Sequence, residues 1–428
     1  MIIKVIDLFA GCGGLSDGFF KTNNFDMVCV VEWNRKCCET QIHNITHKFG
    51  KQEAEKRVIN FDIQDYKKLI NGWKEEKNYP KHFYSKTGIK ALKKEYGQID
   101  LIIGGPPCQA YSLAGRVQDK NGMKDDYRNY LFESYIKIVD YFRPLALIFE
   151  NVPGMLSAKP GRKTVTEKIR KSFGEHGYEI IEDIKKYAVF NCADFGVPQN
   201  RKRVILLGLR KDVFGQRSQK ILKKFYTEIM PSLKKTGKNV RQAIGDLPSF
   251  FPKKLNGKIS YFPSDSDIPN HKPRFHNKRD MNIFKTLAED IQSGKKKYTS
   301  PKILKQLYTK KTGKKSSLHK YSVLRWDQPS TTIVAHLHKD GLRHIHPDSL
   351  QARSITPREA ARLQSFDDDF IFLGSQSDQY KMIGDAVPPL FSKALAVGVD
   401  MLLTQETKQK IRQKSVYPSM ELSLPKSI

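Results

Sequence analysis

The stretch Leu101-Ile-Ile-Gly-Gly-Pro-Pro-Cys-Gln-Ala-Tyr-Ser112 decides which fold this chain is expected to adopt. It begins with an apolar run typical of a buried strand, which ends at two glycines and two prolines, and Cys108 follows directly. Proline fixes φ and donates no N–H, so Pro106 and Pro107 hold the thiol in one place without sheet partners. Open α/β sheets place their sites just beyond strand ends. The pattern predicts either a reactive thiol or an ordinary buried cysteine in a turn.

The composition favours a basic, globular protein with more than one domain. The chain has 428 residues, of which 39% are hydrophobic, and a formal charge of +30. The length exceeds that of one ordinary core, so two domains are expected. A charge excess of this size repels itself unless the partner is a polyanion, which makes nucleic acid the first partner to consider. The alternative is a soluble protein that is merely basic.

The cysteines indicate neither a metal site nor a disulfide framework. There are six of them, without a C-x-x-C pair or a regular spacing. Reduced thiols in a cytosolic protein fit this usage best. The chain opens directly into a strand-like run with no signal peptide, and no apolar run reaches the roughly 18 residues that span a bilayer. We therefore expect a cytoplasmic protein that binds no metal and no membrane.

The first segment of the chain predicts a nucleotide-binding unit. A strand over residues 2–9 leads into the turn Ala10-Gly-Cys-Gly-Gly-Leu-Ser-Asp-Gly18 and then a helix, whose N–H groups would accept a polar ligand. The third glycine of the dinucleotide fingerprint is missing, yet the next apolar run ends in Glu32, about where an acidic residue binds ribose hydroxyls. An adenosine ligand without a pyrophosphate satisfies both observations. Glu32 alone is also consistent with a solvated carboxylate at a strand end.

A second group of polar residues follows two further strands. The buried-strand pattern over 145–149 ends in Glu150, on the same sheet edge as Cys108. Arg201 and Arg203 alternate along an incoming strand, so they share a face that suits an anion or a base carbonyl. Taken alone, the two arginines also fit a solvated strand edge. A thiol, a carboxylate and two guanidinium groups beside a nucleotide site together predict an active site.

Most of the excess charge lies in one segment. Residues 213–322 contain 26 Lys and Arg against 7 Asp and Glu, a net charge of +19. Aromatic residues and prolines interleave there with poor periodicity, as expected of a module that contacts phosphates. We therefore expect a basic, phosphate-contacting domain over residues 213–325, between an α/β domain over 1–212 and its return segment over 326–404, followed by a basic tail over 405–428. The alternative is a solubilising insertion.

Local patterns predict three helices and one loop. Thr356 is an N-cap, Pro357 takes the first helical position and Glu359 completes a capping box. Residues 113–127 are charged and aperiodic beside the candidate thiol, which predicts a mobile lid. Two apolar helix faces are expected from residues at helical spacing: Leu131, Tyr135, Ile138, Val139 and Phe142 for one, and Leu390, Ala394, Val397 and Met401 for the other.

The order of these motifs resembles that of the DNA (cytosine-5)-methyltransferases of the bacterial restriction–modification type. The similarity covers most of residues 1–402. The matching stretches are Asp7-Leu-Phe-Ala-Gly-Cys-Gly-Gly-Leu15, Gly105-Pro-Pro-Cys-Gln109, Glu150-Asn-Val152, Gln199-Asn-Arg-Lys-Arg203, Arg358-Glu-Ala-Ala-Arg-Leu363 and Gly384-Asp-Ala-Val-Pro-Pro389. The resemblance implies a Rossmann-like S-adenosylmethionine-dependent methyltransferase domain with a smaller, basic, loop-rich target-recognition domain over 213–325. It also implies duplex DNA as the partner and S-adenosyl-L-methionine as the methyl donor.

The resemblance implies a role for each matching residue. Cys108 would add to carbon 6 of a flipped-out cytosine, and Glu150 would act as the acid at ring nitrogen 3. Arg203, together with Arg201, would hold the base carbonyl, and the lid over 113–127 would close behind the base. The residues implied to line the cofactor pocket are Phe9, Gly11, Gly13, Leu15, Glu32, Trp33, Asp62, Ile63, Pro107, Leu131, Ala386 and Val387.

Two residues depart from the family pattern. Asp367 stands where the family usually has Pro, and Asp385 stands where it usually has Asn and adds a negative charge beside the expected cofactor. Two alternatives stay open: a transfer-RNA cytosine-5 methyltransferase of the same fold, and a non-catalytic DNA-binding protein on a methyltransferase scaffold. The large basic module favours DNA, and the intact thiol, acid and arginine favour an enzyme. We expect a monomer, with a cognate restriction endonuclease as a further partner to test.

Overall fold

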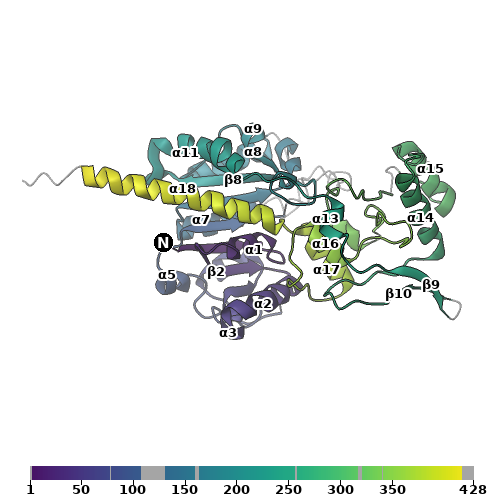
Figure 1. Cartoon of the computed structure of the whole chain (residues 1–428). Helices are drawn as coiled ribbons and strands as arrows, with labels where there is room; N and C mark the ends of the chain where they lie inside the picture. The colour runs from purple at the N-terminus through teal and green to yellow at the C-terminus, as the bar shows by residue number, and fades with distance from the viewer. Residues whose placement is uncertain are drawn as a thin grey trace, which may run out of the picture.

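A sheet of eight strands forms the larger lobe of the molecule (Figure 1). The computed structural model describes residues 2–77, 79–107, 131–159, 163–255, 258–316, 321–339 and 341–416, with the backbone alone at 255, 258 and 405–416. Cys108 and the expected lid over 113–127 lie outside the described residues. The strands are β1 (Ile3–Leu8), β2 (Phe25–Glu32), β3 (Val58–Asn60), β4 (Leu101–Gly104), β5 (Ala146–Asn151), β6 (Tyr178–Ile180), β7 (Val189–Asn191) and β8 (Lys202–Arg210).

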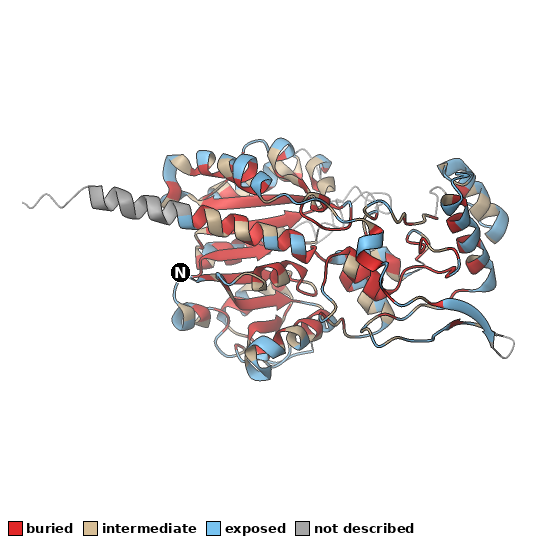
Figure 2. Ribbon diagram, in the orientation of Figure 1, coloured by how far each residue is buried: buried red, intermediate tan, exposed pale blue. Residues whose placement is uncertain are grey.

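The sheet has the doubly wound order β3-β2-β1-β4-β5-β8-β6, and β7 also pairs with β8. The first five strands in this order are parallel, whereas β8 runs antiparallel to β5. Parallel strands that are covered on both faces consist of nearly continuous apolar runs. Ile102, Ile103 and Leu147 are accordingly fully buried, and Figure 2 shows the strands as the buried centre of the lobe. The predicted Rossmann-like α/β fold is confirmed.

Helices surround this sheet. Tyr135 on α7 lies under the sheet, where its hydroxyl donates to the carbonyls of Ile102 and Ile148, and the predicted buried face of α7 is confirmed. The helices of the sheet lobe are α1 (Gly14–Phe20), α2 (Arg35–Phe49), α3 (Lys51–Arg57), α4 (Tyr66–Asn71), α5 (Ala91–Tyr96), α7 (Leu131–Phe142), α8 (Val165–Glu175), α9 (Ile184–Tyr187), α10 (Lys211–Phe214), α11 (Ser218–Lys224), α12 (Met230–Ser232) and α18 (Pro389–Val416), with a π-helical turn over Phe225–Ile229.

The long helix α18 runs from the second lobe back along the sheet lobe (Figure 1). Its predicted apolar face was wrong: Leu390 is exposed and Ala394, Val397 and Met401 are half-buried, while the buried face is Phe391, Leu395, Val399 and Leu402. The reason is tertiary, because α18 packs closely on α1, where a Cβ on Gly18 would overlap Ser392. The stretch Gln376–Thr404 is apolar enough to cross a membrane, but 67% of its apolar window is buried inside the protein.

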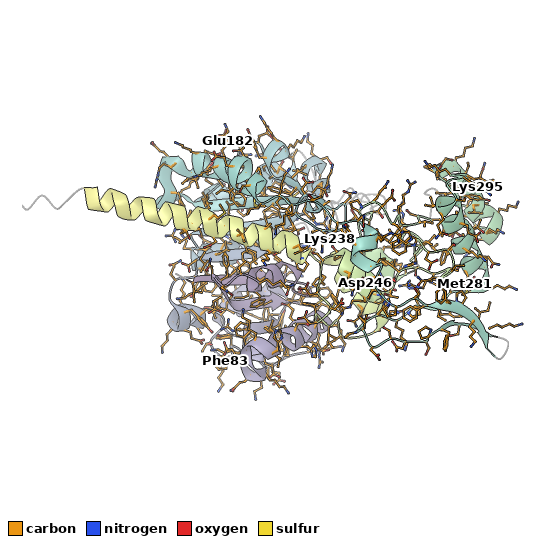
Figure 3. All side chains as sticks on the ribbon, viewed as in Figure 1. Phe83, Glu182, Lys238, Asp246, Met281 and Lys295 are labelled. Atoms are coloured by element: carbon orange, nitrogen blue, oxygen red, sulfur yellow. The ribbon has the colours of Figure 1, made fainter. Side chains whose placement is uncertain are left out.

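A second core gives the smaller lobe its own interior. It joins Val240, Ile244 and Leu247 to Ile333, Ile355 and Leu363. The elements of the smaller lobe are α13 (Val240–Ile244), the hairpin β9 (Phe251–Leu255) and β10 (Lys258–Phe262), α14 (Lys278–Gln292), α15 (Pro301–Thr312), α16 (Pro357–Leu363) and α17 (Gln376–Asp385). In Figure 3, Lys238 and Asp246 lie where this lobe begins, and Met281 and Lys295 lie at its far end.

Part of the basic segment after residue 212 packs into the core of the sheet lobe. Phe214, Leu222 and Met230 belong to the core of the sheet lobe, so that lobe extends well beyond residue 212. Most of the expected return segment belongs to the second core, and the chain rejoins the first core at Val387. Charge describes the surface of a segment, whereas a domain boundary is set by which core the apolar residues enter.

Candidate active site

Glu150 lies at the carboxyl end of β5 and faces the turn that follows β4. Its Oε1 is 2.7 Å from Arg203 Nε, and both side chains are about nine-tenths buried. A Cβ on Gly105 would be 2.7 Å from Glu150 Oε2, so only glycine lets the turn approach the carboxylate. Asn151 Nδ2 donates to the Pro106 carbonyl at 3.2 Å. The Gly-Pro-Pro turn is therefore held against Glu150, and Cys108 is the next residue in the sequence.

The electrostatics around Glu150 raise the pKa of its carboxyl above the usual range. Burial raises the pKa of the carboxyl, and the positive charges of Arg203 and Arg201 only partly oppose this effect. Cys192, a second thiol, is buried close to these charged groups, and burial raises its pKa to about 12. Cys192 is therefore an inert thiol, while the carboxyl of Glu150 can hold a proton in a site from which water is largely excluded.

The two arginines of the Gln199–Arg203 motif do different things. Arg203 pairs with Glu150 and also donates from Nη1 to the Lys202 carbonyl at 2.8 Å. Arg201 donates instead to the backbone carbonyls of residues 333, 384 and 386, at 2.6, 2.9 and 2.9 Å. The charges of both act on Glu150, as a shared face implies. The ion-paired guanidinium beside Glu150 nevertheless belongs to Arg203.

A glycine turn at the end of β1 forms the other half of the site. Gly11 and Gly13 have φ of +58° and +92°, which favour glycine, and Phe9 also has a positive φ of 60°. A Cβ on Gly11 would meet no heavy atom within 4 Å, so the turn borders open space. A Cβ on Gly14 would overlap the Val387 carbonyl oxygen. The predicted residues Ala386 and Val387 are therefore packed against this turn.

Glu32, at the end of β2, is held by backbone N–H groups. Its Oε2 accepts from Gly11 N–H at 2.9 Å and its Oε1 from Asn34 N–H at 2.8 Å. Burial raises its pKa to about 7 despite these hydrogen bonds. Next to it, the Trp33 ring is 66% exposed. A fixed carboxylate, a free aromatic face and an open glycine turn fit an adenosine group.

The remaining predicted pocket residues lie near the same edge of the sheet, at the carboxyl ends of its parallel strands. Leu15, Ile63 and Leu131 are buried, while Asp62 and Pro107 are half-buried. Asp62 follows β3 and accepts from Gln64 N–H at 3.0 Å, so its carboxylate caps a short helical turn. Within the described residues, no group of three or more His, Cys, Asp or Glu side chains could hold a metal ion.

Sequence reasoning missed two amides that shape this half of the site. Gln41 Nε2 donates to the Gly11 carbonyl at 2.8 Å. Asn60 Nδ2 donates to the carbonyls of Glu32 and Trp33, at 3.1 and 2.8 Å. Both amides come from neighbouring elements and fix the backbone rather than face a ligand. Only the position of Asn60, two residues before Asp62 at a predicted strand end, could have suggested its role.

The comparisons with known proteins agree with this geometry. The family model described as C-5 cytosine-specific DNA methylase matches residues 3–399. The chain belongs to this family. The Type II methyltransferase M.Bpa9945I of Bacillus paralicheniformis is 34% identical to it, over 92% of this chain and 98% of the relative. The Type II methyltransferase M1.HphI of Haemophilus parahaemolyticus is 30% identical, over 95% and 89% of the two chains.

Solved structures show the same fold. A prophage-encoded E. coli protein named as a DNA modification methyltransferase has a TM-score of 0.57 and 24% identity, and the match covers 94% of this chain and 99% of that protein. The Dnmt2 methyltransferase of S. pombe has a TM-score of 0.51 and 16% identity, over 95% and 99% of the chains. The chain is a DNA (cytosine-5)-methyltransferase of the restriction–modification type, and its family implies S-adenosylmethionine as the methyl donor.

Proposed function

We propose that this methyltransferase modifies carbon 5 of a cytosine within a specific sequence of duplex DNA, through a covalent bond between Cys108 and carbon 6 of the base. One observation carries the proposal: a buried carboxyl, Glu150, is paired with Arg203 and lies against the turn that leads to Cys108. The family and the names of the relatives support a place in a Type II restriction–modification system, with a cognate endonuclease that recognises the same site.

The proposed mechanism begins with activation of the base. Carbon 5 of cytosine is a poor nucleophile, so the Cys108 thiolate adds to carbon 6 and forms a carbon–sulfur bond. The addition places negative charge on the ring, and this charge is neutralised when Glu150 delivers its proton to ring nitrogen 3. When bound, S-adenosylmethionine supplies the electrophilic methyl group. A general base then takes the carbon 5 proton, and the Cys108 sulfur leaves as thiolate with the electron pair of its bond to carbon 6. The proton on ring nitrogen 3 returns to Glu150, which restores the aromatic ring. The base has to be flipped out of the duplex first, because stacking covers carbon 6.

Arg203 is placed to serve both charged partners of this reaction. Its guanidinium keeps Glu150 in position and presents further N–H donors to the site, which suit the carbonyl of the base. A cation beside the Gly-Pro-Pro turn also favours the ionised form of a thiol that follows the turn. The raised pKa of Glu150 supports its role as the proton donor.

The proposed cofactor pocket lies at the ends of β1 and β2. Glu32 would accept the ribose hydroxyls through lone pairs that its two backbone donors leave free, and the exposed Trp33 ring would stack on adenine. The open space at Gly11 would admit the rest of the nucleoside. The other residues proposed to line the pocket are Phe9, Gly13, Leu15, Asp62, Ile63, Pro107, Leu131, Ala386 and Val387.

The second lobe has two features suited to duplex DNA. In the β9–β10 hairpin, Phe251 opposes Phe262 and Lys253 opposes Ser260 on one face. These phenylalanines are 43% and 59% exposed, and Lys253 Nζ lies 4.8 Å from the Phe262 ring centroid. A two-stranded ribbon with lysine and aromatic side chains fits a groove of DNA. This hairpin lies within residues 213–325, which supports the proposal that this segment recognises the target.

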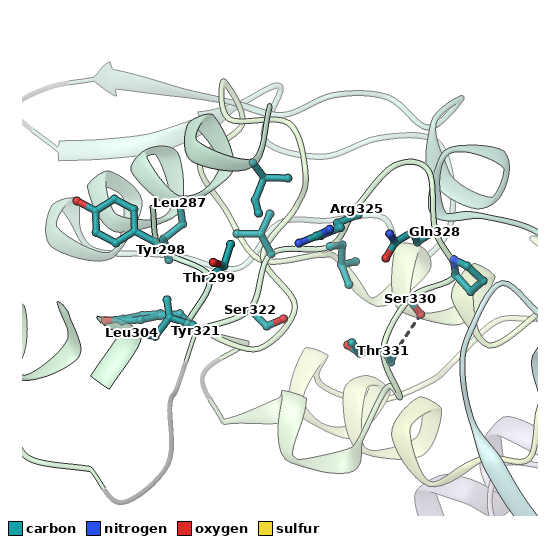
Figure 4. A pocket seen from close by; sticks show the side chains of 14 residues that line it. Leu287, Tyr298, Thr299, Leu304, Tyr321, Ser322, Arg325, Gln328, Ser330 and Thr331 are labelled. Carbon is teal, nitrogen blue, oxygen red and sulfur yellow. Dashed lines mark hydrogen bonds between the residues drawn. The ribbon is translucent and has the colours of Figure 1, made fainter. Parts of the chain in front are cut away.

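The second feature is a cavity of about 220 Å³ between α14, α15 and residues 321–331 (Figure 4). Its polar lining includes Arg325 and Gln328, whose side chains pair with guanine and adenine in major-groove recognition. The cavity lining includes Ser330, whose backbone pairs with Pro198 and Asn200, just before Arg201 and Arg203 in the sequence. A base pair read here would lie next to the methylated cytosine.

Methyl transfer from labelled S-adenosylmethionine tests the proposal. Purified protein and the variant Cys108→Ala are each mixed with unmethylated duplex DNA and, separately, with bulk transfer RNA. Label that appears in DNA as 5-methylcytosine, and disappears in the variant, supports the proposal. Label on RNA would favour the transfer-RNA alternative. Label on neither substrate would leave a DNA-binding protein. Sedimentation of the same preparation tests whether the protein is a monomer, and cell fractionation tests whether it is cytoplasmic.

A further inference from the structure

Arg201 occupies a position that catalysis at the base does not explain. Its side chain is 1% exposed, and two of its three guanidinium nitrogens are already used by backbone carbonyls. Among the described residues, the third, Nε, has no hydrogen-bond partner. Nη2 alone bonds the carbonyls on both sides of Asp385, those of Gly384 and Ala386, at 2.9 Å each. The guanidinium therefore clamps the turn that follows α17.

This clamped turn reaches the glycine turn directly. Ala386 and Val387 press on Gly14, where a Cβ would overlap the Val387 carbonyl oxygen. Cys12 Sγ lies 3.6 Å from the Met382 carbonyl, one helical turn earlier on α17. The turn over 384–387 therefore forms a wall of the glycine turn, and its position depends on how firmly α17 and Arg201 hold it.

A second contact of Arg201 reaches the second lobe. Nη1 of Arg201 donates to the Ile333 carbonyl at 2.6 Å, and Ile333 N–H donates to Gln199 Oε1 at 2.8 Å. Gln199 Nε2 in turn bonds Gln364 Oε1, and Gln364 Nε2 bonds the Ile383 carbonyl, at 2.9 and 2.6 Å. This network of backbone and amide contacts ties the segment that leads into β8, the strand of Arg203, to the second lobe.

Nearby acidic groups act on the charge of Arg201. Burial and the neighbouring Arg203 lower its pKa to about 9, while Cys192, Glu150 and Asp385 favour its charged form. The guanidinium is therefore still protonated at neutral pH. Asp385, which stands where the family usually has Asn, lies beside this buried cation. The positive charge of Arg201 therefore opposes the effect of burial on the pKa of the Asp385 carboxyl.

We infer that Arg201 is a positioning residue that holds the 384–387 turn against the glycine turn, and so couples cofactor binding to the strand that carries Arg203. This inference rests on the proposed cofactor pocket. It assigns the two arginines of one motif to different ligands: Arg203 to the base, and Arg201 to the shape of the cofactor site. A planar fork with several donors makes such contacts, and a lysine ammonium in its place does not reproduce them.

Binding of S-adenosylhomocysteine to the full-length protein, measured by calorimetry without DNA, tests this inference. Arg201→Lys and Arg201→Met should weaken binding by about tenfold or more, the equivalent of one lost charge-assisted hydrogen bond. Arg203→Lys, the matched variant on the same strand, should bind the ligand as the wild-type protein does. Its methylation rate at saturating cofactor should fall. Unchanged binding in both Arg201 variants, with a rate loss like that of Arg203→Lys, would overturn the inference.

Two further readouts separate this inference from the function it rests on. If the wild-type protein fails to bind S-adenosylhomocysteine, the proposed pocket fails as well, whereas equal binding by wild type and Arg201 variants contradicts the clamp alone. If the Arg201 variants do not fold, hydrogen exchange of the wild-type protein decides. Ligand binding should slow exchange in peptides that contain Ile333 and residues 384–387. Unchanged exchange at both would contradict the coupling.

Discussion

Each lobe of this methyltransferase buries one Arg–Glu pair, and the two pairs differ in how well the carboxylate is satisfied. In the second lobe, Arg353 Nη1 and Nη2 bond both oxygens of Glu359 at 2.7 and 2.6 Å, and the Thr356 N–H donates to Oε2 at 2.7 Å. In the sheet lobe, Glu150 has one ion-pair contact among the described residues, at 2.7 Å from Arg203. A fully satisfied buried pair stabilises one structure, whereas an under-satisfied one can exchange a proton.

The pKa values of the two carboxyls express this difference. Burial raises the pKa of both, but around Glu359 the positive charges of Arg353 and His346 and the hydrogen bonds from Arg353 overcome it and lower the pKa to about 2. Around Glu150, burial outweighs its two arginines and the pKa is raised. The comparison indicates that Glu359 stabilises α16 as a charged group, whereas burial disfavours the charged form of Glu150.

The largest expected effect is on catalysis by the variant Glu150→Gln. The amide keeps the shape of the carboxyl but cannot deliver the proton to ring nitrogen 3. The single-turnover methylation rate should fall by about 10² to 10⁴-fold, the range for a lost general acid. A rate within a factor of two of wild type would contradict the role of Glu150.

The matched variant in the other lobe, Glu359→Gln, should affect stability instead. It leaves Arg353 buried without its counter-charge, which costs about 3–5 kcal/mol. Urea unfolding at pH 7 measures this loss, and the methylation rate per folded molecule should change little. If Glu359→Gln were as stable as wild type, the conclusion that Glu359 stabilises α16 as a charged group would be wrong.

The contributions of the two carboxyls to stability should also depend on pH in opposite directions. The folded pKa of Glu359 is about 2, below its unfolded value of about 4.3, so its contribution to stability is complete above pH 4.3 and is lost as the pH falls towards 2. Glu150 has the opposite sign, since a raised folded pKa reduces stability as the pH rises above 4.3. The free energies of unfolding of wild type and Glu359→Gln should therefore converge as the pH falls from about 5 to about 2, the range that spans these pKa values. Parallel curves would contradict the assignment.

The smallest effect is expected for Asp385→Asn, which restores the residue usual in the family. Asp385 raises the pKa of Glu32 only as its weakest cause, and its carboxylate is one of several charges around Arg201. The affinity for S-adenosylhomocysteine should therefore change by less than about fivefold, the scale of a weak charge interaction. A larger loss would show that the carboxylate itself, and not the Arg201 fork, holds the turn.

Local patterns in the sequence predicted the parts of the fold that depend on local chemistry. The capping box of Thr356 and Glu359 at the start of α16 is confirmed, because a cap involves only neighbouring residues. Glu150 was placed at a strand end on the same edge as the Gly-Pro-Pro turn, and the register of β4 and β5 places it there. Strand ends are predictable because apolar runs stop where the sheet stops.

Contacts between distant segments were not predictable. The carbonyl partners of Arg201 lie 132 to 185 residues further along the chain, and backbone carbonyls leave no trace in a sequence. The packing of the segment after residue 212 was not predictable from charge, because lysines cover a surface regardless of the core beneath it, and Phe214 and Leu222 enter the first core. The predicted face of α18 failed for the same reason, since its orientation depends on the contact between Gly18 and Ser392.

Covalent trapping on DNA tests the central claim most directly. The target sequence is first found by sequencing the methylated products, and a duplex is then made with 5-fluorocytosine at the target position. Fluorine cannot leave as the proton does, so the reaction should stop with the protein bonded to the base. Peptide mapping should place the adduct on Cys108, and none should form with Cys108→Ala. Methylation of ordinary DNA without any adduct on the fluorinated duplex, or an adduct mapped to Cys192, would contradict the proposed mechanism.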